Sequence, residues 1–284
     1  MAETPIPETI PLYTPNQQAL LLLGQRLDHK PWLPLGIYYE NLWHFILEQH
    51  PDFQLVTHNL QVASFKNGIK QTLGEYDLIY RLNGQAYHRE LAVKFYLGLP
   101  LSKEPVSPWH HWVGPGLKDR LDRKMQRMCN HQITLSDTPE GKQTLAAQGI
   151  FSVTKEILIQ GRLFYPVFAQ CPPPLHAHPD HLRGYWLTLA QCEQWLSRQP
   201  HSHRGQILSK PFWLNNETLS SNMPSQTLLQ RLNNVPLPAL LKHHNEYYFI
   251  VPENWQHQAI PVVFQNATRR QESEAPYLHG WSVC

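Results

Sequence analysis

Cysteine is scarce in this chain, and long apolar runs are absent. The four cysteines (Cys129, Cys171, Cys192 and Cys284) lack the paired spacing of a zinc site or a disulfide framework. The apolar run at 20–23 is far too short for a membrane span or a signal core. We therefore expect a reduced, cytoplasmic protein with no membrane segment and no structural zinc.

A large excess of charge and the common nucleotide-binding motifs are also missing. The 24 Lys and Arg residues nearly balance 22 Asp and Glu, so the bulk charge gives no argument for nucleic acid as a partner. There is no Walker loop, no Gly-x-Gly-x-x-Gly and no Gly-x-Ser-x-Gly. Kinase, dinucleotide-binding and hydrolase-elbow functions therefore have no support.

What the chain does contain is a strong hairpin signal at residues 74–95. Two runs rich in β-branched and aromatic residues flank Asn83-Gly84, a dipeptide typical of two-residue turns. With this dipeptide in the turn, Leu82 pairs with Gln85, and the pairing of all preceding residues follows from it.

That register gathers charged residues on one face of the hairpin. Asp77 falls opposite Glu90 and Glu75 opposite Ala92, and Lys94 shares their face because side chains alternate along a strand. Facing like charges destabilise a sheet, so either one carboxyl is protonated or a cation lies between them. The other interpretation is a solvated face on which Lys94 neutralises a carboxylate. The opposite face predicts the core side: Tyr76, Leu78, Tyr80, Leu91, Val93 and Phe95.

The patterns along the rest of this region predict the order helix, strand, strand, strand, helix, strand, after an N-terminal arm and a short helix. The expected ranges are 1–14 for the arm, 15–27 for the short helix, 38–49 for the next helix, 53–63 for a strand, 117–132 for a helix and 152–167 for a strand.

Two longer motifs resemble a known family. Residues 90–97 (Glu-Leu-Ala-Val-Lys-Phe-Tyr-Leu) and 113–124 (Val-Gly-Pro-Gly-Leu-Lys-Asp-Arg-Leu-Asp-Arg-Lys) look like an uncharacterised bacterial family, domain of unknown function 1853. The close resemblance covers roughly residues 35–166, with weaker similarity beyond. The element order and Gly-Glu-x-Asp before the hairpin also resemble the PD-(D/E)XK nuclease superfamily, of which that family is regarded as a remote branch. This resemblance implies a restriction-endonuclease-like αβββαβ core.

The resemblance also implies a metal-dependent phosphodiesterase site. By analogy with the superfamily, Asp77, Glu90 and Glu40 would be the ligands of Mg²⁺ or Mn²⁺. Lys94 would be the catalytic lysine that positions or activates water. Gln132 loosely matches a polar residue that some members place near the metal. Mg²⁺ prefers oxygen ligands and lowers the pKa of bound water, so the chemistry is sound.

Ala92 departs from the superfamily pattern. The usual acid-to-lysine spacing is two residues, whereas Glu90 and Lys94 are four apart, about 13 Å along a strand. In one interpretation Lys94 keeps its place and Glu75, about 7–8 Å away on the diagonal, substitutes for Glu90. In the other, Glu90 keeps its place opposite Asp77, and Ala92 has replaced the lysine.

Basic and aromatic residues follow the hairpin. Arg120, Lys124, Arg127 and His131 recur at helical spacing. They either contact phosphate, chiefly through Arg120 and Lys124, or form a solvated face paired with nearby aspartates. The Trp-His-His-Trp cluster at 109–112 either stacks on bases or forms a buried lid.

From residue 170 the composition changes. Residues 170–181 are rich in Pro and His and predict a linker. The region 182–284 predicts a small α+β extension with a helix over 225–233 and strands over 247–251 and 260–264. Its aromatic residues either fill a core or form a surface for a protein partner.

Together these patterns predict an α/β protein with a restriction-endonuclease-like core over 1–169 and an α+β extension over 182–284. The expected function is Mg²⁺- or Mn²⁺-dependent hydrolysis of DNA or RNA, with Asp77, Glu90 and Lys94 catalytic and Glu40 or Glu75 in support. The alternative is a protein that kept the fold, lost the metal site, and binds nucleic acid or a protein partner.

Overall fold

A computed structural model of the chain describes residues 16–28, 33–200, 202–210, 212–214 and 222–265. The expected arm, 1–14, and the last part of the expected extension, 266–284, lie outside these residues. The described chain divides into two compact units. Unit 1 lies between residues 16 and 93 and between 126 and 159; unit 2 lies between 94 and 125 and between 160 and 265. The expected linker at 170–181 falls inside unit 2.

The described strands belong to a ten-stranded mixed sheet, which confirms the expected α/β class. Its order is β1-β2-β3-β5-β6-β10-β9-β7-β8, and β4 pairs with β3. The strands are β1 Phe53–Lys66, β2 Ile69–Leu82, β3 Gln85–Gly98, β4 Trp112–Val113, β5 Thr154–Pro166, β6 Arg183–Thr188, β7 Arg204–Leu208, β8 Met223–Pro224, β9 Ala239–His243 and β10 Glu246–Val251.

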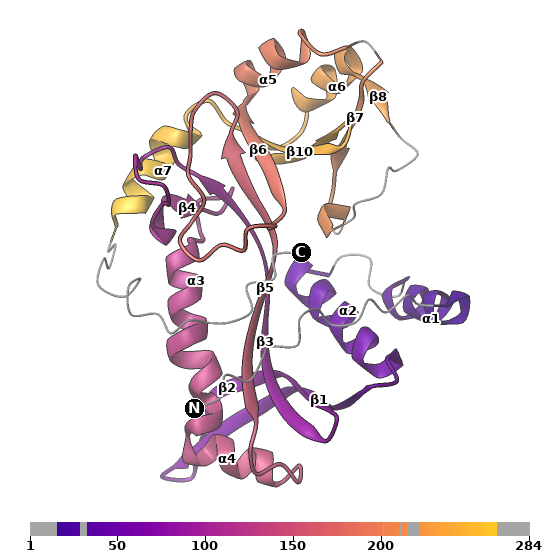
Figure 1. Cartoon of the computed structure of the whole chain (residues 1–284), viewed down its shortest axis with the longest axis vertical. Coiled ribbons are helices and arrows are strands. Elements are labelled where there is room, and N and C mark those ends of the chain that lie inside the picture. Colours follow the sequence, from indigo (N-terminus) through magenta and orange to yellow (C-terminus); the bar gives the residue numbers. More distant parts are fainter. Residues whose placement is uncertain (1–15, 29–32, 201, 211, 215–221, 266–284) are drawn as a thin grey trace. The chain divides into compact units, whose positions relative to one another are not determined.

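The described helices match most of the expected ones (Figure 1). The expected helix over 117–132 is α3 followed by one π-helical turn, η2, and a 3₁₀ turn, η3. The α-helices are α1 Gln17–Asp28, α2 Leu35–Gln49, α3 Leu121–Arg127, α4 Pro139–Ala146, α5 Leu189–Leu196, α6 Ser225–Leu232 and α7 Trp255–Phe264; the short turns are η1 Trp109–His111, η2 Met128–Gln132, η3 Ile133–Asp137 and η4 Phe212–Leu214.

The central hairpin of unit 1 forms as its turn predicts. Asn83 and Gly84 both have positive φ, +50° and +80°, which a two-residue type I′ turn requires. Leu82 pairs with Gln85, which confirms the expected register near the turn. The ladder between β2 and β3 ends at Leu78 and Arg89, one pair before Asp77 would face Glu90.

Both faces of this hairpin are buried, which corrects the expectation of one core face and one charged surface. Ile79 and Glu90, on the face predicted to be polar, are both 0% exposed. A hydrophobic cluster, to which η3 and α4 contribute residues, covers this part of unit 1. Its buried members are Val62, Tyr76, Ile79, Ala86, Leu135, Leu145 and Ile150. A charged group on this face therefore lies in the core and needs a hydrogen-bonded partner.

The core of unit 2 forms around parallel pairs of β6 with β5 and β10, extended by antiparallel β9 and β7. Residues 260–264, expected as a strand, belong instead to helix α7. Trp255, Ala259 and Val263 recur every four residues, and all three are buried, so helical spacing fits this segment better than alternation does.

The aromatic residues of unit 2 are largely internal. All four residues of the 109–112 cluster are buried, in agreement with the buried-lid alternative. Trp186 and Trp255 are also buried, with ring centroids 5.2 Å apart. These tryptophans fill the core and provide no surface for a partner.

No described helix is long and apolar enough to cross a bilayer.

A buried histidine in unit 1 predicts sensitivity to acid. His44 of α2 is 3% exposed, stacks on His58 at 3.9 Å, and has no hydrogen-bond partner on either ring nitrogen among the described residues. Burial, and then the positive charges of His58 and Arg26, lower the pKa of His44 to about 4. The unfolded chain, with a His pKa near 6.5, therefore binds more protons between pH 4 and pH 6.5.

We expect the free energy of unfolding to fall as the pH drops from 7 to 5, and His44→Phe to reduce that fall by about 1 kcal/mol or more. At pH 7 the variant should be at least as stable as the wild type, because a buried unsatisfied group is removed. Urea denaturation at both pH values measures this, with exposed His131→Phe as the control. An equal acid response in both variants would contradict the assignment.

Candidate functional site

Glu90 of β3 is a carboxylate enclosed in the core of unit 1. Its side chain is 0% exposed, and each oxygen accepts a hydrogen bond. His88 Nε2 lies 2.7 Å from Oε1, and Gln132 Nε2 lies 2.7 Å from Oε2. Burial lowers the pKa of His88 to about 4, so at neutral pH its uncharged ring donates from Nε2. Glu90 is thus held by donors from two separate parts of unit 1.

Gln132, the polar residue that the resemblance implies near a metal, donates a hydrogen bond to Glu90. Gln132 ends the π-helical turn η2, directly after α3. π-Helical turns are rare and often occur where a side chain must be re-aimed. In the sequence, the helical spacing of 117–132 predicts a helix there but gives no signal for the wider turn.

Ser136, His88 and Glu90 form a chain of contacts in the order of a serine–histidine–acid triad. Ser136 Oγ lies 3.4 Å from His88 Nδ1 and 3.3 Å from the Ile133 carbonyl oxygen. Ser136 is 5% exposed, and both His88 and Glu90 are 0% exposed. Because a nucleophile must reach its substrate, this closed arrangement fits a structural role.

Asp77 of β2 binds the backbone of β3. Its Oδ2 accepts a hydrogen bond of 2.8 Å from the Leu91 amide, just beyond the end of the ladder at Leu78 and Arg89. The carboxylate thus takes the place of a backbone acceptor where the two strands separate. This side-chain contact explains why the regular pairing with Glu90 that the sequence predicts is absent.

The supporting carboxylates do not complete a metal shell in the part of the chain that the structure describes. Glu40 is half-buried on α2, and Glu75 Oε1 accepts a 3.0 Å hydrogen bond from Asn59. No three His, Cys, Asp or Glu side chains among the described residues are grouped to hold a metal ion, so Glu40, Asp77 and Glu90 do not converge on one. A metal at Glu90 would also have to displace His88 or Gln132. The residues, as placed, do not fit a resident metal.

The opposite face of unit 1 holds a buried ion pair that the sequence does not reveal. Arg89 Nη2 and Nε lie 2.6 and 2.7 Å from Glu156 Oε2, and the Tyr80 hydroxyl donates to the same oxygen at 2.7 Å. The guanidinium lies 5.0 and 5.2 Å from the ring centroids of Tyr80 and Trp43. Strand alternation places Arg89 on the apolar face, but no local pattern identifies Glu156 as its partner.

Lys94 lies in unit 2, where it pairs with Asp119. Its Nζ lies 2.6 Å from Asp119 Oδ2, and the Tyr96 hydroxyl donates to the same oxygen at 3.3 Å. The side chains of Lys94 and Asp119 are 32% and 37% exposed, so the pair contributes about 1 kcal/mol at most. Asp119 belongs to the 113–124 motif, and Lys94 belongs to the 90–97 motif. The ion pair therefore joins the two motifs.

Arg120, expected to bind phosphate, lies in the core of unit 2. It is 0% exposed and binds Asp122 through two bonds, Nε to Oδ1 at 2.5 Å and Nη2 to Oδ2 at 2.7 Å. Its Nη1 donates to the carbonyl oxygens of Val263 and Gln265 at the end of α7. These carbonyls have no partner within the helix, so Arg120 acts as a C-terminal cap. Lys124, the other expected phosphate ligand, is half-buried.

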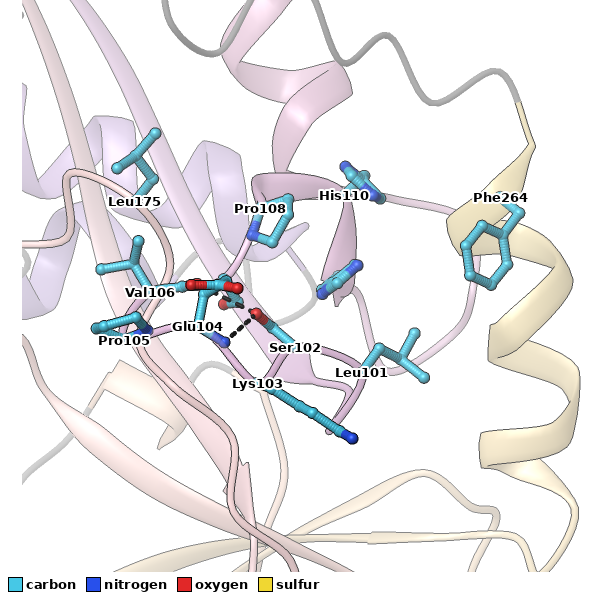
Figure 2. Close-up of a pocket in the computed structure, with 12 residues that line it drawn as sticks. Leu101, Ser102, Lys103, Glu104, Pro105, Val106, Pro108, His110, Leu175 and Phe264 are labelled. Carbon is cyan, nitrogen blue, oxygen red and sulfur yellow. Dashed lines mark hydrogen bonds between the residues drawn. The ribbon is translucent and has the colours of Figure 1, made fainter.

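A pocket of about 720 Å³ lies within unit 2, apart from every expected site residue (Figure 2). The loop before η1 forms one side, and His110 and His111 of η1, together with Leu175 and Phe264, complete the lining. Ser102 Oγ accepts from the Glu104 amide and donates to the Val106 carbonyl, so this polar group serves the loop itself. The volume is typical of small-molecule sites, and the lining includes two charged residues, Lys103 and Glu104.

Comparison with curated proteins and with solved structures gave no match. One family model, described as a domain of unknown function (DUF1853), matches residues 13–258. This range includes α2, the central hairpin, the Asp119 motif and most of unit 2, and it extends well beyond the expected span of 35–166. The chain therefore belongs to the DUF1853 family.

Proposed function

We propose that this protein binds the phosphate backbone of nucleic acid through residues 118–127, which comprise α3 and the turn before it. The observation that carries the proposal is the charge balance of this segment. Lys94 neutralises Asp119, and Arg120 neutralises Asp122. Three basic residues are exposed in the same short segment: Lys118, Arg123 and Arg127.

This arrangement supports binding because the acids that would repel phosphate are already paired. The buried Arg120 forms an ion pair with Asp122. It therefore does not serve as a phosphate ligand in this proposal. Arg123 donates two long, exposed bonds to Gln265, one to its carbonyl oxygen at 3.3 Å and one to Oε1 at 3.5 Å, so it can turn to a ligand at little cost. Binding of this kind depends on counterion release and needs no metal.

Charge reversal on α3 tests the proposal. The double variant Arg123→Glu/Arg127→Glu should weaken binding of a fluorescent DNA or RNA by tenfold or more in EDTA, and should reduce the salt slope by about two. The control is Arg198→Glu/Arg231→Glu, which makes the same change in net charge at exposed positions of unit 2. Equal losses in both variants would mean that net charge, and not this helix, determines binding.

The second candidate is Mg²⁺- or Mn²⁺-dependent hydrolysis of DNA or RNA, as the resemblance to PD-(D/E)XK nucleases implies. The contact of Gln132 with Glu90 favours it, because the resemblance places a polar residue there. It would require His88 or Gln132 to release Glu90 before a metal could bind, with Lys94 as the catalytic lysine.

Cleavage assays separate the two candidates. A nuclease should cut plasmid DNA or RNA in Mn²⁺ and lose that activity in Asp77→Asn, a change that preserves an acceptor for the Leu91 amide. A binding protein should leave DNA and RNA uncut in Mn²⁺ and should still bind them in EDTA.

A further inference from the structure

The far part of the β1–β2 hairpin, residues 63–72, forms an arm in which Ala63 and Ser64 are half-buried, and Phe65 and residues 67–72 are exposed. Its backbone pairs run from Ala63 with Thr72 to the turn at Asn67-Gly68. Phe65 and Ile69 are 73% and 72% exposed, among the most exposed large apolar residues described. A two-stranded ribbon with no core is only marginally stable by itself. Packing within the arm therefore does not explain the exposed apolar side chains at its tip, and exposed apolar surface marks interaction sites.

The register distributes these side chains over both faces of the arm. Phe65 pairs directly with Lys70, so the two share one face. Ile69 precedes Lys70 on β2 and therefore points to the opposite face. Each face of the tip thus presents an apolar side chain to solvent.

The charge of the hairpin points to an anionic partner. From Phe53 to Gly74 there is no Asp or Glu, whereas Lys66 and Lys70 both lie in the arm. The same stretch contains eight amide or hydroxyl residues, which can donate hydrogen bonds to phosphates or base edges: Gln54, Thr57, Asn59, Gln61, Ser64, Asn67, Gln71 and Thr72.

We propose that this arm enters a groove of duplex DNA, with Lys70 contacting phosphate and Phe65 or Ile69 wedging against a base step. The inference rests on the proposed binding of nucleic acid and identifies its partner. A two-stranded ribbon fits the major groove of B-form DNA, and apolar side chains that unstack base steps are common among proteins that bend DNA. Duplex RNA has a deep, narrow major groove, which side chains cannot read.

The test uses a DNA duplex that contains 2-aminopurine, whose fluorescence rises when its base step is unstacked. In EDTA the wild-type protein should bind the duplex and increase this fluorescence. Phe65→Ser/Ile69→Ser should bind about tenfold more weakly and abolish the increase. The control is Phe151→Ser, because Phe151 lies in the same unit and is 88% exposed.

A second pair of variants tests the charge. Lys70→Glu should reduce the salt slope of binding by about one or more, whereas Lys103→Glu, at another exposed lysine, should not. All four variants change exposed residues, and unchanged unfolding midpoints would show that they fold.

The outcomes distinguish this inference from the proposed function. If the wild type binds duplex DNA and the serine variant matches it in affinity and fluorescence, the arm is not the wedge, although binding through α3 stands. If duplex RNA gives the same affinity and the same losses, the assignment to DNA is overturned. If no nucleic acid binds in EDTA, the proposed function fails, and this inference fails with it.

Discussion

Arg120→Met is expected to lower the free energy of unfolding by about 3–5 kcal/mol, the cost of breaking a buried ion pair. Methionine replaces the stem of the arginine but none of its donors. Asp122 would lose both bonds from the guanidinium, and the carbonyls of Val263 and Gln265 would lose their cap. Urea denaturation followed by tryptophan fluorescence measures the loss.

Arg123→Met is the matched control, since it removes the same charge from an exposed position three residues later, in α3. It should change stability by no more than about 0.5 kcal/mol while weakening nucleic-acid binding. The opposite pattern, with a stable Arg120 variant that has lost binding, would show that Arg120 faces phosphate after all.

Glu90→Ala is expected to cost about 3 kcal/mol, because the buried His88 Nε2 and the half-buried Gln132 Nε2 would lose their acceptor. Glu90→Gln preserves the size of the side chain and one acceptor oxygen, so its loss should be smaller. Thermal and urea unfolding at pH 7 measure both variants, where His88 is uncharged because its pKa is about 4.

The sign of this change separates a structural carboxylate from one held for a metal. A carboxylate that awaits a metal has no adequate partner in the free protein, so its removal would leave stability unchanged or raise it. A stabilised Glu90→Ala variant would therefore contradict the structural role and favour the nuclease candidate.

Local signals in the sequence predict the central hairpin well. Asn83-Gly84 determines the turn because both residues must adopt positive φ, and the pairing of Leu82 with Gln85 follows from it. The register fails only where the Asp77 side chain replaces a backbone acceptor at Leu91. A contact of this kind depends on the separation of the two strands, which no alternation pattern records.

The environment of Glu90 could not be predicted from its own strand. Alternation places Glu90 on a polar face, but residues some 40 to 60 positions later, in η2, η3 and α4, cover that face and supply Gln132. The spacing of apolar residues gave no sign of His88 as a partner.

Basic residues show the same limit. Helical spacing groups Arg120 with Lys124 and Arg127, yet Arg120 is internal and Arg127 is exposed. The difference arises because the end of α7, more than 130 residues later, lies against Arg120. Periodicity indicates which residues share a helix face, but only tertiary packing decides what covers it.

Metal-free binding of nucleic acid is the proposed activity of this protein. The most direct measurement is the affinity for one duplex DNA in EDTA and again in Mn²⁺, for the wild type and for Asp77→Asn. Equal affinity is expected in all four cases, with a salt slope of about −3 to −4 for three phosphate contacts from residues 118–127 and one from Lys70. Binding that appears only in Mn²⁺, and is lost in Asp77→Asn, would contradict it.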